Sequence, residues 1–471
     1  MKFAKTNDIA PLFCLLVLAI HWLNQWHGTY GLMFDEAQYW YWAKHLAWGY
    51  YSKPPMIAWL MAASTALFGD GNFGAKMLAP VILLLTGAVL YATARRLNYS
   101  SYIASWVLIT YVTLPVVTGN SAFFTTDVPL QLCWAVALYA TVTALCTARP
   151  HYWLLAGTAV GLGMLSKYTM IAFAVSGFLA LLLTKASRQQ LRSAWPWAGA
   201  CIALLLIAPN LLWNAQHHFV TFNHTNDNVF SKRLEIYPED MFVFIASQFA
   251  VFGPILLMAL IYSIKPTKRS DNITLLHCFV WPLAVVGIVV SLLAGAQAHW
   301  IAPVYLSAIL IVVPMLARRA AYLLPLSLTL HLIVMALFYA APAVVPTLGF
   351  KRDPFARLFV WNTLADELKP LISTYPDAII MTNERKIAAA FTYQLRDSAT
   401  IDKPVYKWKA AGIVRDHYDL VTENQNLAGK PALLVLRTTV MDAQIPRSDA
   451  RLLRQLTLQK YPFSVYLLPS Y

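Results

Sequence analysis

The chain has 471 residues, of which 59% are hydrophobic and only 12% are charged, and its formal net charge is +14. Soluble domains carry about 25% charged residues, so this composition excludes a disordered chain, a nucleic-acid-binding module and an ordinary cytosolic enzyme. The 5 cysteines all lie within apolar runs, which is typical of small buried residues and not of a disulfide or metal framework. The sequence therefore predicts a polytopic membrane protein.

Acidic residues are distributed unevenly along the chain. Of the 22 acidic residues, 10 precede position 347 and the other 12 lie in the last 125 positions. We therefore expect a membrane domain at residues 1–346, with a first outer loop at 28–55, and a C-terminal soluble domain at 347–471.

Apolar runs of spanning length or slightly less recur along the membrane part. The first follows a short basic start and resembles a signal peptide. No small-residue cleavage site follows it, so we interpret it as a membrane helix. The runs predict about 11 transmembrane helices, at residues 11–26, 72–93, 101–118, 128–147, 152–166, 168–184, 195–213, 241–263, 273–292, 301–316 and 321–340.

The Lys and Arg residues between these runs indicate the orientation. If the N-terminus is cytoplasmic, most of them fall in the inner connections, among them Arg95, Arg96, Arg318 and Arg319. Of the 10 early acidic residues, 8 then fall on the outer side. The pattern predicts a membrane protein with a cytoplasmic N-terminus, an outer C-terminal domain and an outer functional face. Its net positive charge mostly reflects topology, and no nucleic-acid partner is expected.

The first outer loop carries two candidate features. Asp35 and Glu36 precede a stretch rich in Trp and Tyr, typical of a helix in the membrane interface. Asp35, with Gln38 three residues later, also fits an N-cap, so spacing alone leaves both a capping and a chemical role open. Lys53 precedes two prolines and is placed to neutralise a lipid phosphate, or else simply extends its charge into water.

A third outer segment brings Asp127 to the start of a predicted span, where it would cap the helix or act chemically. Two carboxylates and a lysine from three segments then meet at one outer surface. This arrangement suits transfer of a group from a phosphate-linked lipid. A carboxylate takes the proton of an acceptor hydroxyl, and cations hold the phosphate leaving group.

These motifs resemble those of the polyprenyl-phosphate-sugar-dependent glycosyltransferases of the C-type membrane fold (glycosyltransferase family 39). The chain is most similar to the branch that contains protein O-mannosyltransferases and lipid A aminoarabinose transferases. The resemblance covers the membrane part in order. It rests on the Asp-Glu pair with its aromatic helix, Lys-Pro-Pro, Thr-Asp-Val-Pro, and residues 157–168 and 299–303.

The resemblance implies inverting transfer from an undecaprenyl-phosphate sugar to a lipid A, lipopolysaccharide core, other glycan or protein acceptor. It places this reaction at the outer face of the bacterial inner membrane, with the C-terminal domain in the periplasm. It implies that the pair Asp35 and Glu36 takes part in the chemistry, with Asp35 as the leading candidate for the general base. By the same resemblance Asp127 orients a substrate and Lys53 binds the donor phosphate. Two further residues are candidates for the phosphate: Lys167 as a second cation, and His299 as a contact or a simple interfacial anchor.

One departure concerns a metal ion. In the aminoarabinose transferases a glutamate that helps to hold a metal precedes the lysine, and here that position is Ser52. Residues 220–230 look like the histidine-bearing stretch of that family, which puts His224 at a ligand position. A divalent metal at His224 is therefore an expectation, with an interfacial hydrogen-bonding histidine as the alternative.

The C-terminal domain is expected to be a small α/β domain, because helical and strand patterns alternate along it. It shows no phosphate-binding loop and no catalytic triad. We expect it to cover the active-site cavity or contact the acceptor, or to be a structural cap.

Two other functions stay open on the sequence. A transporter or flippase for lipid-linked saccharides would usually show repeated halves and ionisable residues at mid-membrane depth, and neither is evident. A non-catalytic scaffold is compatible with the C-terminal domain, but leaves the acidic and basic residues of the first loop unexplained.

Overall fold

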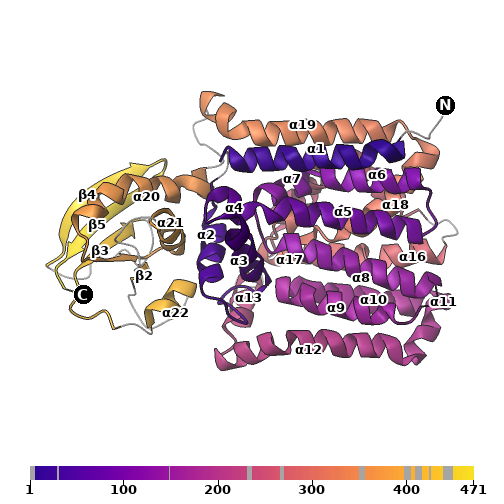
Figure 1. The fold of residues 1–471 in the computed structure, drawn as a ribbon, viewed down its shortest axis with the longest axis horizontal. Helices are drawn as coiled ribbons and strands as arrows, with labels where there is room; N and C mark the ends of the chain where they lie inside the picture. The colour runs from indigo at the N-terminus through magenta and orange to yellow at the C-terminus, as the bar shows by residue number, and fades with distance from the viewer. Residues whose placement is uncertain are drawn as a thin grey trace.

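The computed structural model describes residues 6–470 apart from 29–30, 148, 231–235, 266–269, 349–355, 397–404, 409–415, 424–425 and 439–448. The described residues form a helical bundle that continues at one end into a smaller domain built on a sheet (Figure 1). The N-terminus lies at the opposite end of the bundle (Figure 1). The predicted class, a polytopic helical protein with a small C-terminal α/β domain, is confirmed.

Each predicted apolar run coincides with one helix or with a consecutive pair of helices. The bundle helices are α1 (Thr6–Trp26), α5 (Leu78–Arg96), α6 (Ser101–Thr113), α7 (Pro115–Ala122), α8 (Asp127–Thr147), α9 (Tyr152–Ser166), α10 (Ile171–Leu183), α12 (Ala194–Gln216), α14 (Pro238–Val251), α15 (Pro254–Tyr262), α16 (Asp271–Cys278), α17 (Trp281–Ala294), α18 (Val304–Arg319) and α19 (Leu323–Val344).

Fewer spans than predicted have full length. Among the described residues, 6 helical stretches are long and apolar enough to cross a membrane, or 8 if each bent pair is one span. The bends are 52° between α6 and α7 and 110° between α14 and α15. Both second halves begin with a proline, which cannot donate the backbone hydrogen bond that would continue the preceding helix. The remaining predicted runs are shorter helices, so the total of 11 stays a prediction.

A layer of short helices crosses the end of the bundle, between the long helices and the C-terminal domain (Figure 1). It contains α2 (Phe34–Lys44), α3 (Met56–Phe68), α4 (Asn72–Lys76) and α13 (Val220–Phe230). In α2, 7 of the 11 residues are buried. The predicted interface helix is therefore packed between protein layers. The apolar helix α3 was not among the predicted elements.

The C-terminal domain consists of a five-stranded sheet with helices. The strands lie in the order β2-β1-β3-β5-β4. β1 is parallel to β2 and β3, whereas β5 is antiparallel to β3 and β4. The elements are α20 (Ala356–Thr374), β1 (Ile379–Thr382), α21 (Arg385–Gln394), β2 (Tyr406–Lys407), α22 (His417–Glu423), β3 (Ala432–Arg437), β4 (Arg451–Leu458) and β5 (Tyr461–Leu468).

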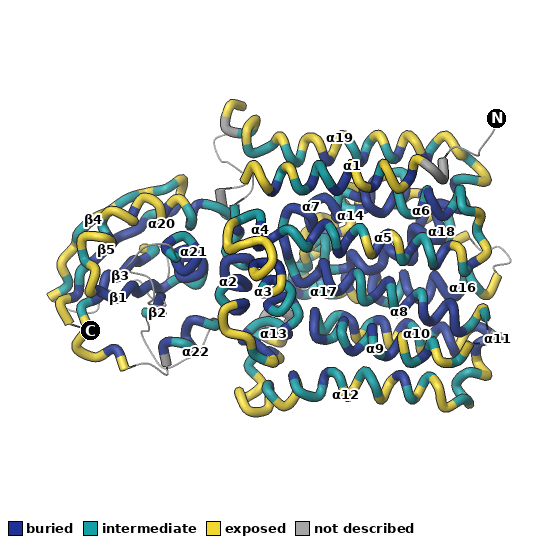
Figure 2. Tube along the Cα trace, viewed as in Figure 1, coloured by how far each residue is buried: buried dark blue, intermediate teal, exposed yellow. Residues whose placement is uncertain are grey.

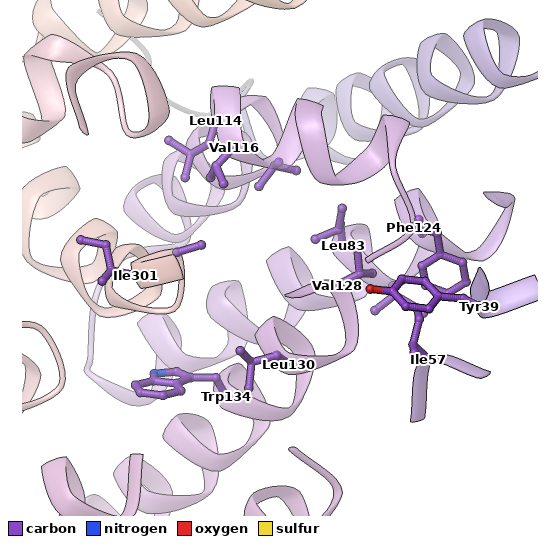
Figure 3. Packing of buried hydrophobic residues seen from close by; sticks show 14 of the residues in the cluster. Tyr39, Ile57, Leu83, Leu114, Val116, Phe124, Val128, Leu130, Trp134 and Ile301 are labelled. Carbon is purple, nitrogen blue, oxygen red and sulfur yellow. The ribbon is translucent and has the colours of Figure 1, made fainter. Parts of the chain in front are cut away.

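One cluster of buried apolar residues runs from the bundle through the end layer into the C-terminal domain. Tyr39 of α2, Ile57 of α3 and Val128 of α8 lie in its central part, close to Phe124 (Figure 3). By contrast, the outer surfaces of α12 and α19 carry exposed leucines, as lipid-facing helices do (Figure 2). A continuous core holds the C-terminal domain against the end of the bundle. The predicted domain boundary falls in the short helix Val345–Leu348 and stays a prediction.

Candidate active site

Asp35 lies where the end layer meets the C-terminal domain. Its Oδ1 accepts a hydrogen bond from Arg385 Nη1 at 2.9 Å, and the same nitrogen donates to Gln38 Oε1 at 2.6 Å. The side chains of Asp35 and Arg385 are 34% and 30% exposed, so the pair is open to a ligand. Arg385 is the first residue of α21 and comes from the C-terminal domain. The domain therefore takes part in the site.

The capping role considered for Asp35 belongs to Glu36. Helix α2 begins at Phe34, and the Glu36 carboxylate accepts a hydrogen bond from the Met33 backbone N–H at 2.9 Å. Gln38 binds Arg385 and does not complete the predicted capping box. The Asp35 side chain is thus not used for the cap, and its Oδ2 makes no hydrogen bond with any residue that the structure describes.

Glu36 is a buried structural residue. Its side chain has 0% exposure and lies 3.2 Å from Lys76 Nζ, which is itself 1% exposed. It also accepts a hydrogen bond at 2.7 Å from the Phe124 backbone N–H, in the segment before α8. Because both carboxylate oxygens are occupied and inaccessible, this geometry does not support the prediction that Glu36 takes part in the chemistry. It joins the start of α2 to the segment before α8.

Asp127, the first residue of α8, is held by residues of two other segments. Its Oδ1 accepts a hydrogen bond at 2.7 Å from Lys167 Nζ, just after α9, and its Oδ2 lies 3.6 Å from His299 Nε2, in the short helix Ala298–Ile301. The carboxylate is only 3% exposed, whereas Lys167 and His299 are 17% and 41% exposed. Asp127, Lys167 and His299, which the sequence analysis named as candidates from separate connections between helices, therefore lie in contact.

The protonation of His299 depends on these neighbours. Burial lowers the pKa of its imidazole, the Asp127 carboxylate opposes this shift, and the charges of Lys167 and Lys53 lower the pKa further. The pKa therefore lies below its usual value of 6.5, and the ring is mostly neutral near pH 7. Its contact with Asp127 is not a full ion pair at that pH.

Lys53 links the two carboxylates electrostatically. Burial and the charge of Lys167 lower the pKa of its ammonium, while Asp35 and Asp127 both raise it. The influence of all these charges on one side chain means that the loops carrying them converge. Lys53 itself makes no ion pair with any described residue. A phosphate can therefore bind Lys53 without first breaking an ion pair.

Tyr39 was missed by the sequence reasoning. It is 5% exposed and lies in the buried apolar cluster, near Phe124 and Val128 (Figure 3). Burial, together with the negative charges of Asp35, Asp127 and Glu36, raises the pKa of its hydroxyl well above the usual value. Tyr39 is therefore neutral, and it lies close enough to both Asp35 and Asp127 for their charges to act on it.

The described residues do not supply a metal site of the expected kind. No group of three or more His, Cys, Asp and Glu side chains lies close enough to hold an ion in the described part of the chain. The His224 ring packs on Tyr51 with centroids 5.1 Å apart, and Ser52 provides no carboxylate. The donor set does not fit the expected divalent ion, and a metal at His224 stays an untested prediction.

Arg385 and Lys76 could not be assigned from the sequence, for different reasons. Arg385 lies 350 positions from Asp35 in a domain with no recognisable motif. Lys76 did leave a signal, because it is an isolated charge beside an apolar run, and such residues are usually paired. Its partner could have been sought among the few acidic residues of the membrane part.

Comparisons with known proteins agree with this architecture. A family model described as dolichyl-phosphate-mannose-protein mannosyltransferase matches residues 52–213, which include Lys53, Asp127 and Lys167. ArnT from Cupriavidus metallidurans bound to undecaprenyl phosphate has a TM-score of 0.65, with 16% identity over 98% of both chains. At that identity the likeness shows the fold.

Sequence relatives extend the match. An undecaprenyl phosphate-alpha-4-amino-4-deoxy-L-arabinose arabinosyl transferase of Pseudomonas aeruginosa is 32% identical over 139 residues, 28% of this chain and 24% of the relative. The lipid A galacturonosyltransferase RgtD of Rhizobium johnstonii is 32% identical over 391 residues, 82% of this chain and 81% of the relative. With a match of that extent, the chain belongs to the family of membrane-embedded glycosyltransferases that includes RgtD.

Proposed function

We propose that the protein transfers a sugar from an undecaprenyl-phosphate donor to lipid A or the lipopolysaccharide core at the outer face of the bacterial inner membrane. The observation that carries this proposal concerns the Lys53 ammonium at the junction of the bundle and the C-terminal domain. Both Asp35 and Asp127 influence it, and it forms no ion pair with any residue that the structure describes. The names of the relatives supply the classes of donor and acceptor.

In this proposal the reaction is a single displacement. The acceptor hydroxyl attacks the anomeric carbon, and its proton passes to Asp35 Oδ2, the carboxylate oxygen that Arg385 leaves available. The bond between the anomeric carbon and the phosphate oxygen breaks, and undecaprenyl phosphate leaves with that electron pair. Attack opposite the leaving group inverts the anomeric centre.

Lys53 binds the phosphate and stabilises the charge that develops on it as the bond breaks. Asp127 is a positioning residue, because its carboxylate is buried and already holds Lys167 and His299. Lys167 and the partly exposed His299 ring then lie where they can contact the donor.

We also propose the orientation that the sequence predicts. The N-terminus and the C-terminal domain lie at opposite ends of the bundle, which supports a cytoplasmic N-terminus combined with a periplasmic domain (Figure 1). The positive residues of the inner connections favour this direction.

The test uses the purified full chain in proteoliposomes with undecaprenyl-phosphate sugars and lipid A or lipopolysaccharide core. Mass spectrometry of the acceptor should show the addition of one glycosyl residue, and NMR should show inverted anomeric configuration. Movement of the donor across the bilayer without covalent transfer would instead establish a flippase. Glycosylation of a protein in place of the lipid would overturn the proposed class of acceptor.

A further inference from the structure

Helix α21 brings two consecutive cations, Arg385 and Lys386, to the start of α2. The Arg385 guanidinium lies 5.4 Å from the centroid of the Phe34 ring, and Lys386 Nζ lies 5.2 Å from the same centroid. Lys386 Nζ is also 5.4 Å from the centroid of the Trp361 ring. Aromatic faces attract a cation but leave its charge uncompensated. The charge of Arg385 is balanced by Asp35, whereas Lys386 adds a positive charge that no described carboxylate pairs with beside the same site.

The carboxylates around these cations are already paired. Asp35, Asp127, Glu384 and Asp416 are the acidic residues that most influence Lys53, Arg385 and Lys386. Each carboxylate already has a cationic partner. The distances are 2.9 Å for Asp35–Arg385, 2.7 Å for Asp127–Lys167, 3.0 Å for Glu384–Arg437 and 2.5 Å for Asp416–Lys407.

Two lysines of this group, Lys53 and Lys386, make no ion pair with any residue in the described part of the chain. One phosphodiester needs only one of them. The site thus has the charge to bind a second anionic group, at the α21 side.

Arg385 also has a free edge. Its hydrogen bonds to described residues use only Nη1, whereas Nε and Nη2 make none. Neither nitrogen is among the fully buried unpaired atoms, and the side chain is 30% exposed, so both nitrogens have some accessible surface. Nε and Nη2 form the planar edge that binds a carboxylate through two parallel hydrogen bonds. Arg385 can therefore hold Asp35 with one nitrogen and a ligand carboxylate with the other two.

We propose that Arg385 and Lys386 bind the carboxylate of a hexuronosyl group on the lipid donor, which makes this protein selective for an acidic sugar. The inference rests on the proposed function and specifies its sugar. In a hexuronosyl group the carboxyl-bearing carbon and the anomeric carbon flank the ring oxygen. A carboxylate held at the start of α21 therefore places the anomeric carbon beside Asp35, with the phosphate toward Lys53.

The relatives leave this choice open, because their names include both a galacturonosyltransferase and an aminoarabinosyl transferase. The positive charges of Arg385 and Lys386 at the start of α21 favour the acidic sugar over the amino sugar. The ammonium of an amino sugar would face Arg385 and Lys386, and like charges brought together in a partly buried site repel. A neutral sugar would leave the free edge of Arg385 without its best ligand.

The experiment compares two donors that differ in one group, undecaprenyl-phosphate galacturonic acid and undecaprenyl-phosphate galactose, with the same lipid acceptor. The variants are Arg385→Gln and Lys386→Gln, and the matched control is Lys369→Gln, an exposed lysine of α20. The quantity measured is the ratio of kcat/KM for the acidic donor to that for the neutral donor. Thermal unfolding in detergent verifies that each variant is folded.

We expect the native protein to favour the acidic donor. Arg385→Gln should reduce the ratio by about 10- to 100-fold, the size expected for a charge-assisted hydrogen-bonded pair, and Lys386→Gln should reduce it by a smaller factor. Lys369→Gln should leave the ratio unchanged. Lys386 forms no hydrogen bond or ion pair with Asp35, and any effect of its charge on the base would lower kcat/KM for both donors alike. The ratio in this variant therefore reports sugar recognition.

The results that would overturn the sugar proposal differ from those that would overturn the proposed function. Equal losses for both donors in Arg385→Gln, with no change of the ratio in Lys386→Gln, would show that Arg385 only positions Asp35 and would overturn the proposal. Because the acceptor is constant, an effect through acceptor phosphates would also give equal losses. Absence of transfer from any undecaprenyl-phosphate sugar would overturn the proposed function instead.

Discussion

Arg385 Nη1 lies 2.9 Å from Asp35 Oδ1 and joins the first outer loop to a domain 350 positions away. This contact orients one oxygen of the carboxylate, and the other is the one to which the proposed mechanism assigns the proton of the acceptor hydroxyl. The C-terminal domain thus contributes a side chain to the candidate site, and is not only a cover over it.

Replacement of Asp35 by Asn should abolish the general base while it preserves the size of the side chain. We expect kcat to fall by about 10²- to 10⁴-fold, the usual contribution of a positioned base, with little change in donor affinity. Glu239→Gln, at an exposed carboxylate near the start of α14, is the control and should retain activity. A full-rate Asp35→Asn enzyme would exclude Asp35 as the base.

Asp127 and Lys167 should behave as one unit, because they form a hydrogen bond of 2.7 Å in a largely buried setting. Asp127→Asn and Lys167→Gln should each reduce kcat/KM, and the double variant should be little worse than the more impaired single variant. A double-mutant cycle measures this coupling. Strictly additive losses would show that the two residues contribute independently.

Lys53 should make donor binding sensitive to alkaline pH. Burial and the charge of Lys167 hold its pKa below the ordinary value of 10.5, so it loses its proton at a lower pH than a free lysine. As pH rises through this lowered pKa, the phosphate loses its counter-charge, and KM for the donor should increase. Arg remains charged over this range, so Lys53→Arg should bind the donor with a flat pH profile. Measurement of KM across the alkaline range tests this directly, and an unchanged rise in Lys53→Arg would assign it to another group.

Much of this arrangement was predictable because charge is scarce in the membrane part. Asp35, Lys53 and Asp127 stand out against apolar surroundings, and in the structure both carboxylates lie close enough to Lys53 to influence its pKa. The same reasoning misplaced the cap of α2, because it used spacing alone. Glu36 lies one residue after Asp35, and its burial against Lys76 determines which carboxylate turns toward Met33.

The contribution of the C-terminal domain was not predictable. A long-range pair such as Asp35–Arg385 leaves no periodic signal, since it depends on how two separately formed elements pack. Strand β4 was also missed, because it is an edge strand of the sheet and 5 of its 8 residues are exposed. Edge strands commonly carry charged residues, which weaken the alternation of apolar and polar positions.

The buried pair of Glu36 and Lys76 should govern stability more than catalysis. Glu36→Gln removes the counter-charge of a fully buried ammonium, a loss of about 3–5 kcal/mol in comparable pairs. We therefore expect a clearly lower thermal midpoint in detergent, and partial recovery when Lys76→Met removes the second charge. Asp70→Asn is the matched control, because the Lys44–Asp70 pair is 39% and 46% exposed and should matter by less than about 1 kcal/mol. At a temperature where it is folded, Glu36→Gln should still transfer sugar. An inactive variant with an unchanged midpoint would instead place Glu36 in the chemistry.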